Sequence, residues 1–278
     1  MSSMRTNWQG AATLVDPRVP MRFGAFYVAE MRVRNMMKWW PAVVAFGLGN
    51  PILYLLSIGI GIGSLVNKSA AFMEGQSYLT FLAPALLITA GIQGAMDEVT
   101  FPTMEGFLWE KTFFAMNSTA ITPRQIVNGV MYASLARCVL QVLLYELVLV
   151  AFGAVTIVSF VPLFITSVLA GGAFACLMLG VVSGVKEDDG FFAIVGRFII
   201  TPMFMFSGTY YPLSTLPIYL QWIGWISPVW HATDFGRALS YGHPVEGWLM
   251  LVHVLYFVVI AVIGLAIAGR KFEARLSA

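Results

Sequence analysis

Residues 126–185 read IVNGVMYASLARCVLQVLLYELVLVAFGAVTIVSFVPLFITSVLAGGAFACLMLGVVSGV, and this stretch decides the fold. It contains two apolar runs, 126–152 and 160–185, and its only ionised side chains are those of Arg137 and Glu146. The hydrocarbon core of a bilayer is about 30 Å thick and needs roughly 20 mostly apolar residues per helix. Both runs are long enough, so they predict two consecutive membrane-spanning helices.

Four further apolar runs, at 42–62, 78–96, 191–206 and 248–268, flank this stretch. The whole chain is 59% hydrophobic and 11% charged, whereas a soluble domain is roughly 45–50% apolar and about 25% charged. This composition excludes a soluble enzyme. It predicts an all-α membrane protein with six transmembrane helices in a domain at 42–278.

The Lys and Arg residues between the predicted spans indicate the orientation, because cytoplasmic loops carry an excess of them. One side of the membrane carries only Lys68 and Arg237. The other side carries Arg5, Arg18, Arg22, Arg32, Arg34, Lys38, Lys111, Arg124, Lys186, Arg270, Lys271 and Arg275. Both termini are therefore expected in the cytoplasm of a bacterial inner-membrane protein. The net charge of +2 gives no basic stripe for nucleic acid.

A cytoplasmic segment at 1–41 precedes the first span. Within it, residues 21–40 mix aromatic and methionine side chains with basic ones and end in Trp39 and Trp40. This mixture is typical of an amphipathic helix in the membrane interface, in contact with lipid headgroups. The alternative is a positively charged flank that only orients the first span.

Two further segments between spans are too structured for simple connectors. Residues 97–125 combine carboxylates with apolar side chains, which predicts a cytoplasmic helix with an exposed apolar face that binds a partner. Within them, Thr122-Pro123 marks a new helix start. Residues 207–247 contain four prolines and many aromatic residues. They predict a re-entrant pair of short helices, since irregular backbone at membrane depth is tolerated only against protein or a water-filled cavity.

The sequence contains no recognisable pattern for nucleotide binding, metal binding or covalent catalysis. The stretch 63–69 resembles a phosphate-binding loop, but Asn67 replaces the required glycine. His231, His243 and His253 are too far apart in sequence for a helical metal pair. No cofactor is expected in this chain.

Three charged residues fall inside predicted spans: Arg137, Glu146 and Arg197. Intramembrane charges are candidates for function. Arg137 and Arg197 lie close enough to the cytoplasmic ends to snorkel or to make structural hydrogen bonds. If the three instead form a relay, the chain would be a proton- or ion-coupled secondary transporter, although no internal repeat supports that.

The segment after the fifth run carries a family resemblance. It reads Phe204-Met205-Phe206-Ser207-Gly208-Thr209-Tyr210-Tyr211-Pro212-Leu213, then Leu216-Pro217, Ser227-Pro228-Val229-Trp230-His231 and Arg237-Ala238-Leu239. It resembles the permease subunits of ABC-2-type exporters, especially the nodulation-factor export and daunorubicin-type drug-efflux branch. A weaker match covers 110–129, where Thr122-Pro123 and Gly129 fit, but Phe113 is followed by Phe114 in place of an acidic residue.

The resemblance implies a type V exporter-like fold that moves a lipophilic drug, glycolipid or lipid-linked saccharide outwards. It implies a second permease, identical or related, and two copies of a separate ATPase that bind ATP and Mg²⁺, so that this chain is not itself the enzyme. The implied ATPase-coupling residues are Glu30, Arg34, Glu105, Phe107, Glu110, Phe113 and Phe114. The implied gate residues are Phe206, Gly208, Tyr210, Tyr211, Pro212, Leu216, Pro217, Pro228 and His231.

Overall fold

The computed structural model describes residues 18–63, 75–187 and 190–277, and all regular secondary structure in these ranges is helical. Residues 1–17 of the predicted N-terminal segment lie outside the described residues. So do residues 64–69 of the loop that resembles a phosphate-binding motif, with Lys68 among them.

Five helical stretches are long and apolar enough to cross a membrane, and each contains one predicted span or most of it. They are Trp40–Ile58, Tyr78–Trp109, Pro123–Ala151, Ile157–Val182 and Gly247–Leu276. The remaining run, Phe191–Phe206, is helical but shorter. At about 1.5 Å per residue it extends about 24 Å, less than the roughly 30 Å of a hydrocarbon core.

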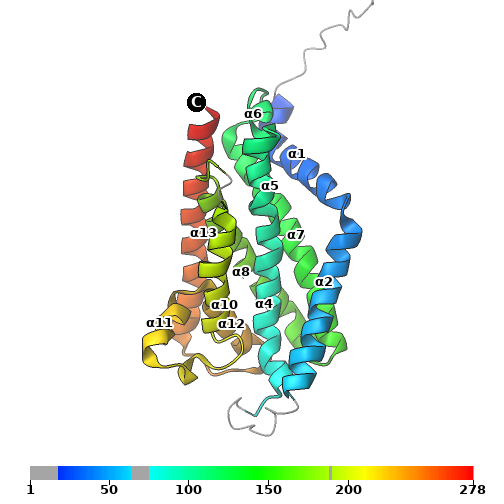
Figure 1. The fold of residues 1–278 in the computed structure, drawn as a ribbon, viewed down its shortest axis with the longest axis vertical. Coiled ribbons are helices and arrows are strands. Elements are labelled where there is room, and N and C mark those ends of the chain that lie inside the picture. Colours follow the sequence, from blue (N-terminus) through cyan, green and yellow to red (C-terminus); the bar gives the residue numbers. More distant parts are fainter. Residues whose placement is uncertain (1–17, 64–74, 188–189, 278) are drawn as a thin grey trace, which may run out of the picture.

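The long helices run side by side along the long axis of the molecule (Figure 1). At one end lie the C-terminus and α6 (Thr112–Asn117), and at the other lies α11 (Ile218–Ile226). Along the chain the elements are α1 (Arg18–Met37), α2 (Trp40–Tyr54), η1 (Leu55–Ile62), α4 (Tyr78–Val99), α5 (Phe101–Met104), η3 (Glu105–Trp109), α6, α7 (Pro123–Ala151), α8 (Ile157–Val182), α9 (Phe191–Val195), η4 (Gly196–Ile200), α10 (Thr201–Phe206), η5 (Leu213–Thr215), α11, α12 (Pro228–Tyr241) and α13 (Gly247–Leu276).

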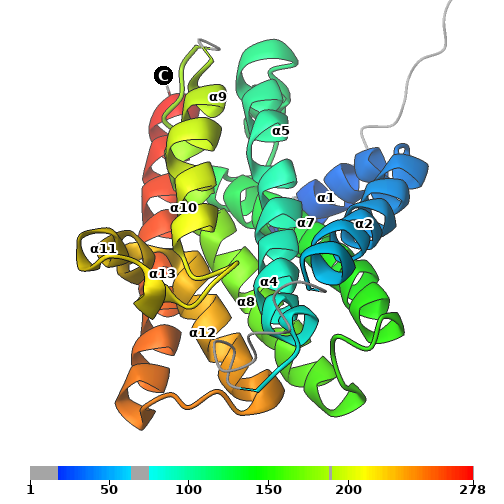
Figure 2. The ribbon, with the colours of Figure 1, turned by 60° about the horizontal axis from the view of Figure 1, so that its bottom comes forward.

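The core forms where α4, α7 and α8 meet, because small residues let their backbones approach closely. A Cβ added at Gly171 of α8 would lie 2.6 Å from the Cys138 Sγ of α7 and 2.8 Å from the Gly91 oxygen of α4. Both cysteines, Cys138 and Cys176, are buried and free of disulfide bonds. In two views α4 lies between α2 on one side and α10 on the other (Figures 1 and 2).

The helix start predicted at Pro123 is confirmed. Thr122 caps α7 by accepting a hydrogen bond from the Gln125 backbone, and the Gln125 side chain accepts one from the Thr122 backbone. This reciprocal pair is a capping box, which satisfies two backbone donors at once. Local sequence alone therefore determines where the third span begins.

The predicted cytoplasmic segment 97–125 differs from expectation in two ways. The second span does not stop near residue 96 but continues, with a break at Thr100, through α5 and η3 to Trp109. Between Trp109 and the start of α7 at Pro123, the one helix is α6, which has six residues. The first part of this segment, to Trp109, is thus an extension of the second span.

The two other predicted helical segments are present. The helix expected at 21–40 is α1, and its buried residues Gly24, Val28, Ala29 and Arg32 face α7 and the end of α4. The pair of short helices expected within 207–247 is α11 and α12. α12 packs against α4, α8 and α13.

Candidate functional site: a polar groove along α4

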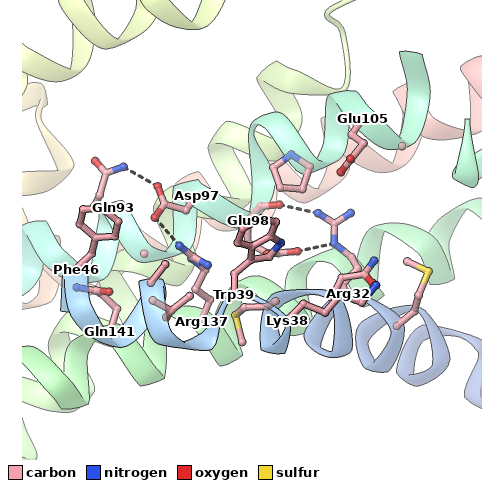
Figure 3. Close-up of a pocket in the computed structure, with 18 of the residues that line it drawn as sticks. Arg32, Lys38, Trp39, Phe46, Gln93, Asp97, Glu98, Glu105, Arg137 and Gln141 are labelled. Atoms are coloured by element: carbon pink, nitrogen blue, oxygen red, sulfur yellow. Dashed lines mark hydrogen bonds and ion pairs between the residues drawn. The ribbon is translucent and has the colours of Figure 1, made fainter. Parts of the chain in front are cut away.

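A cavity of about 1350 Å³ lies between the α1–α2 arm and the extended second span, towards the end of the molecule that carries α6. Figure 3 shows polar side chains around it from α1, α4, η3 and α7, together with Phe46 of α2. The lining is charged at this end: it includes Arg32, Lys38, Asp97, Glu98, Glu105, Glu110 and Arg137.

A buried ion pair joins α1 to the end of α4 inside this cavity. Arg32 Nε donates to Glu98 Oε1 at 2.7 Å, and Arg32 Nη2 donates to the Glu98 backbone oxygen at 2.7 Å (Figure 3). The two side chains are only 5% and 9% exposed. Charges this deeply buried require partners, so the pair holds α1 and α4 in register.

The neighbouring carboxylate, Asp97, connects the end of α4 to α7. Asp97 accepts a hydrogen bond from Arg137 Nη2 of α7 at 2.9 Å and one from Gln93 Nε2 at 2.8 Å. Neighbouring residues 97 and 98 therefore tie the end of α4 to two different helices, α7 and α1 (Figure 3). Arg137 thus makes an interhelical ion pair with Asp97.

Two more cavities continue this space along α4. One, of about 400 Å³, shares Asn50, Gln93 and Gln141 with the first cavity and extends to Tyr54, Tyr145 and Tyr210. The other, of about 880 Å³, shares Gln93 and Asp97 and lies against α9, η4 and α10. We call the three together the α4 groove. Its lining changes from charged groups through neutral amides to tyrosines.

Tyrosines lie at the far end of the α4 groove. The Tyr54 and Tyr210 hydroxyls are 3.3 Å apart, and the Tyr78 hydroxyl donates to the Tyr210 backbone oxygen at 3.3 Å. These contacts connect α2 and α4 to the turn that follows α10. Tyr210, a predicted gate residue, thus lies where the groove meets that turn.

Arg237 of α12, which was not among the predicted gate residues, organises the same turn. Its guanidinium is 5% exposed and donates to the Gly208 oxygen at 2.9 Å, to the Phe81 oxygen at 3.3 Å and to the Thr209 oxygen. It also lies 3.7 Å from the centre of the Phe81 ring. Gly208 has a positive φ of 72°, which favours glycine. The signal in the sequence was a single arginine within an apolar, proline-rich segment, which indicates a buried charge that needs partners.

The remaining predicted gate residues are distributed over this region. Tyr211 donates its hydroxyl hydrogen to the Met205 oxygen at 2.8 Å. Phe206, Pro212 and Leu216 are half-buried and Pro217 is exposed. Pro228 and His231 are buried at the start of α12, away from the lining of the α4 groove.

The predicted coupling surface is wrong for two of its aromatic residues. Phe107 and Phe113 are 3% and 0% exposed, because they stack with Phe272 of α13 at centroid distances of 4.6 and 5.4 Å. Phe114, Glu105 and Glu110 are exposed. Glu30 and Arg34 are exposed and pair with each other at 2.6 Å. Trp109, which the sequence prediction omitted, is 53% exposed beside them.

The three intramembrane charges do not meet. Within the described residues, no hydrogen bond or ion pair joins Arg137, Glu146 and Arg197. Glu146 is fully buried with neither carboxylate oxygen bonded, and Arg197 is exposed on η4 beside the third cavity. The structure thus offers no support for a proton relay through these three residues.

The described part of the chain contains no group of three or more His, Cys, Asp or Glu side chains arranged to hold a metal ion. The three histidines nevertheless lie near one another, at the end of the molecule opposite α6: His243 and His253 contact Asp234, and His231 contacts His253.

Comparison with known proteins places this geometry in context. Residues 26–241 match a family described as ABC-2 type transporter. Nodulation protein J of Neorhizobium galegae is 30% identical over 247 residues, covering 85% of this chain and 92% of that protein. Nodulation protein J of Rhizobium leguminosarum bv. viciae is 28% identical, covering 86% and 92%. The inner membrane transport permease YadH of Escherichia coli K12 is 24% identical, covering 71% and 75%.

Proposed function

Because the chain belongs to the ABC-2 type transporter family, we propose that it is the membrane-spanning permease of an exporter powered by a separate ATPase. The observation that carries the proposal is the α4 groove, a series of cavities that runs from the charged end near α6 to the tyrosines after α10. ATP and Mg²⁺ bind the partner ATPase. This chain supplies the path.

The proposed orientation puts the α6 end of the molecule in the cytoplasm. Arg22, Arg124 and Arg270 belong to elements at that end, together with the C-terminus. In this arrangement Phe191–Phe206 forms a sixth, short span, and α11 and α12 form a re-entrant pair on the outer side of the inner membrane. α1 lies in the cytoplasmic interface with its exposed Phe23 and Phe26 in contact with lipid.

The α4 groove fits an amphiphilic substrate. Its middle carries neutral hydrogen-bonding groups from Asn50, Gln93 and Gln141, which suit a hydroxylated headgroup. The rims present exposed apolar side chains, such as Phe46 and Leu53 on α2 and Phe198 on η4, which suit an acyl or polyprenyl chain. We therefore propose a glycolipid or lipid-linked saccharide as the substrate class, with a lipophilic drug as the alternative.

A second copy of the permease completes the path. α2 and α10 lie on opposite sides of α4 (Figure 2). Both α2 and the 191–206 helices carry large exposed apolar side chains. Pairing two such faces would enclose the groove between copies. Closure of two ATPases would then shift the pair between two packings, since a ligand biases whichever state it binds more tightly.

The cytoplasmic contact with the ATPase consists of Glu105, Trp109, Glu110 and Phe114, with the Glu30–Arg34 pair of α1 beside them. Because η3 continues the second span, force applied here reaches the Asp97–Glu98 connections directly. The coupling residues and the groove lining are thus parts of one element.

The experiment that tests this function removes both exposed carboxylates. Glu105→Ala with Glu110→Ala is expected to insert and fold normally, because neither side chain is buried. In vesicles containing the ATPase, stimulation of ATP hydrolysis by a lipid-linked saccharide should fall at least about fivefold, the lower range of coupling between sites. Glu187→Ala, an exposed carboxylate in the loop after α8, is the matched control and should retain full stimulation. Full stimulation in the double variant would refute the contact.

A further inference from the structure

All three histidines of the chain lie together at the end of the molecule opposite α6. His231 is on α12, His253 is on α13, and His243 is in the connection between these helices. Asp234, one turn along α12 from His231, faces the other two. His253 is fully buried and His231 is 5% exposed. Neither histidine lines the α4 groove.

The buried groups form a continuous chain of hydrogen bonds. His231 Nε2 lies 3.0 Å from the Trp225 backbone oxygen, and His231 Nδ1 lies 2.8 Å from His253 Nδ1. His253 Nε2 lies 3.1 Å from Asp234 Oδ2. The chain therefore begins at a carbonyl of α11, passes through two imidazoles, and ends at a carboxylate of α12.

The number of hydrogens available limits which of these hydrogen bonds can form together. The Trp225 carbonyl can only accept, so His231 Nε2 must carry a hydrogen. The bond between the two Nδ1 atoms needs one hydrogen, and the bond to Asp234 needs another. Two neutral imidazoles supply only two hydrogens. The three bonds need three hydrogens. They form together only when His231, His253 and Asp234 carry one proton more than two neutral imidazoles and an ionised carboxylate do.

The surroundings balance this extra proton with a single negative charge. Asp234 Oδ1 also lies 3.3 Å from His243 Nε2. Burial raises the pKa of Asp234, but the hydrogen bonds from His243 and His253 outweigh burial and lower it overall. Burial and the neighbouring His253 ring lower the pKa of His231.

The other ionisable groups nearby are engaged elsewhere or uncharged. The Tyr256 ring of α13 stacks on His231 at 4.0 Å, and its hydroxyl donates to the Ile226 oxygen. The Arg237 guanidinium points to Phe81 and Gly208. Glu246 accepts a hydrogen bond from Trp248. From the remaining neighbours of α12, α4 contributes Tyr78 at this end, α11 contributes Tyr219, and α8 carries no charged residue.

Protons have a route to the buried pair. A separate cavity of about 410 Å³ is lined by Asp234, His243, Arg237 and Glu246 together with Trp230 and Trp248. Asp234 and His243 are 15% and 23% exposed, so they connect this cavity with the buried His253.

We propose that His231, His253 and Asp234 form a proton-binding site that fastens α12 to α13 and that exchanges protons through the cavity at His243. Loss of the proton leaves either two ring lone pairs facing each other or a bare ring nitrogen facing the Asp234 carboxylate. Both arrangements leave buried polar atoms unpaired, which weakens the contact between the two helices. The site does not depend on the transported substrate; only its exposure to the outside rests on the proposed orientation.

The polypeptide is suited to a direct test because it contains no histidines other than these three. The full-length protein is labelled with ring-¹⁵N histidine, purified through a tag without histidine, and placed in lipid vesicles. In a His243→Gln background the nitrogen spectrum then reports only His231 and His253. We expect three protonated ring nitrogens at pH 7, and loss of the third only about one pH unit or more above the value of about 6.5 for free imidazole. Two protonated nitrogens at pH 7 would overturn the proposal.

Asp234→Asn is the second variant, because it keeps the size of the side chain and removes the negative charge. The pair should then be neutral at pH 7, with two protonated ring nitrogens. An unchanged third proton in Asp234→Asn would refute the role assigned to the carboxylate. The titration of the His243→Gln protein decides the proposal even if Asp234→Asn does not fold.

Discussion

Replacing Arg32 with alanine is expected to destabilise the permease more than substitution of any other buried residue of α1. The substitution leaves the Glu98 carboxylate buried without its partner, and breaking such a pair costs about 3–5 kcal/mol. The measurement is the apparent Tm of the purified protein in mild detergent, which should fall markedly.

Arg34→Ala is the matched control, two residues along the same helix. Arg34 and its partner Glu30 are 77% and 52% exposed, and exposed ion pairs contribute about 0–1 kcal/mol. Its Tm should stay close to that of the unchanged protein. Equal losses in Arg32→Ala and Arg34→Ala would show that the Arg32–Glu98 pair does not hold α1 to α4.

The double variant Arg32→Met with Glu98→Leu separates stability from coupling. Apolar replacement of both partners removes the unpaired charge, so most of the lost stability should return. If the pair also transmits motion from α1 to α4, substrate-stimulated ATP hydrolysis should remain low in this stable variant.

Replacing Arg237 with methionine is expected to loosen the turn between α10 and α11. The methionine keeps an apolar side chain but removes the donors to the Phe81, Gly208 and Thr209 oxygens, and a hydrogen bond to a charged group is worth about 1.5–3 kcal/mol. Amide hydrogen exchange in residues 207–213 should accelerate, because this turn loses its main attachment to α12.

Arg270→Met provides the comparison, since Arg270 is an exposed arginine of α13 near the opposite end of the molecule. Its exchange rates in 207–213 should equal those of the unchanged protein. If Arg237→Met gave the same rates as Arg270→Met, Arg237 would not organise the turn beside Tyr210.

The parts of the fold that depend on local sequence could be predicted. Uninterrupted apolar length located the long helices, and Thr122-Pro123 located the start of α7 through a capping box. The two short helices after α10 followed from the spacing of prolines and aromatic residues. The ABC-2 resemblance read from this segment is confirmed by the family match.

The parts that depend on distant contacts could not be predicted. Phe107 and Phe113 looked like an exposed face because their partner, Phe272, lies more than 150 residues away in the chain. The same holds for Arg237 and for the three histidines, whose partners come from other helices. The second span also runs past its last hydrophobic stretch, since charged Asp97 and Glu98 find partners on α7 and α1.

The most direct test of the account is co-purification. The tagged chain is expressed with a candidate ATPase from its own operon, extracted in mild detergent, and assayed for complex size and ATP hydrolysis. A stable complex of two permeases with two ATPases that hydrolyses ATP is the predicted result. A chain that purifies without the ATPase, and that moves substrate across vesicle membranes in the absence of ATP, would contradict the assignment as an exporter permease.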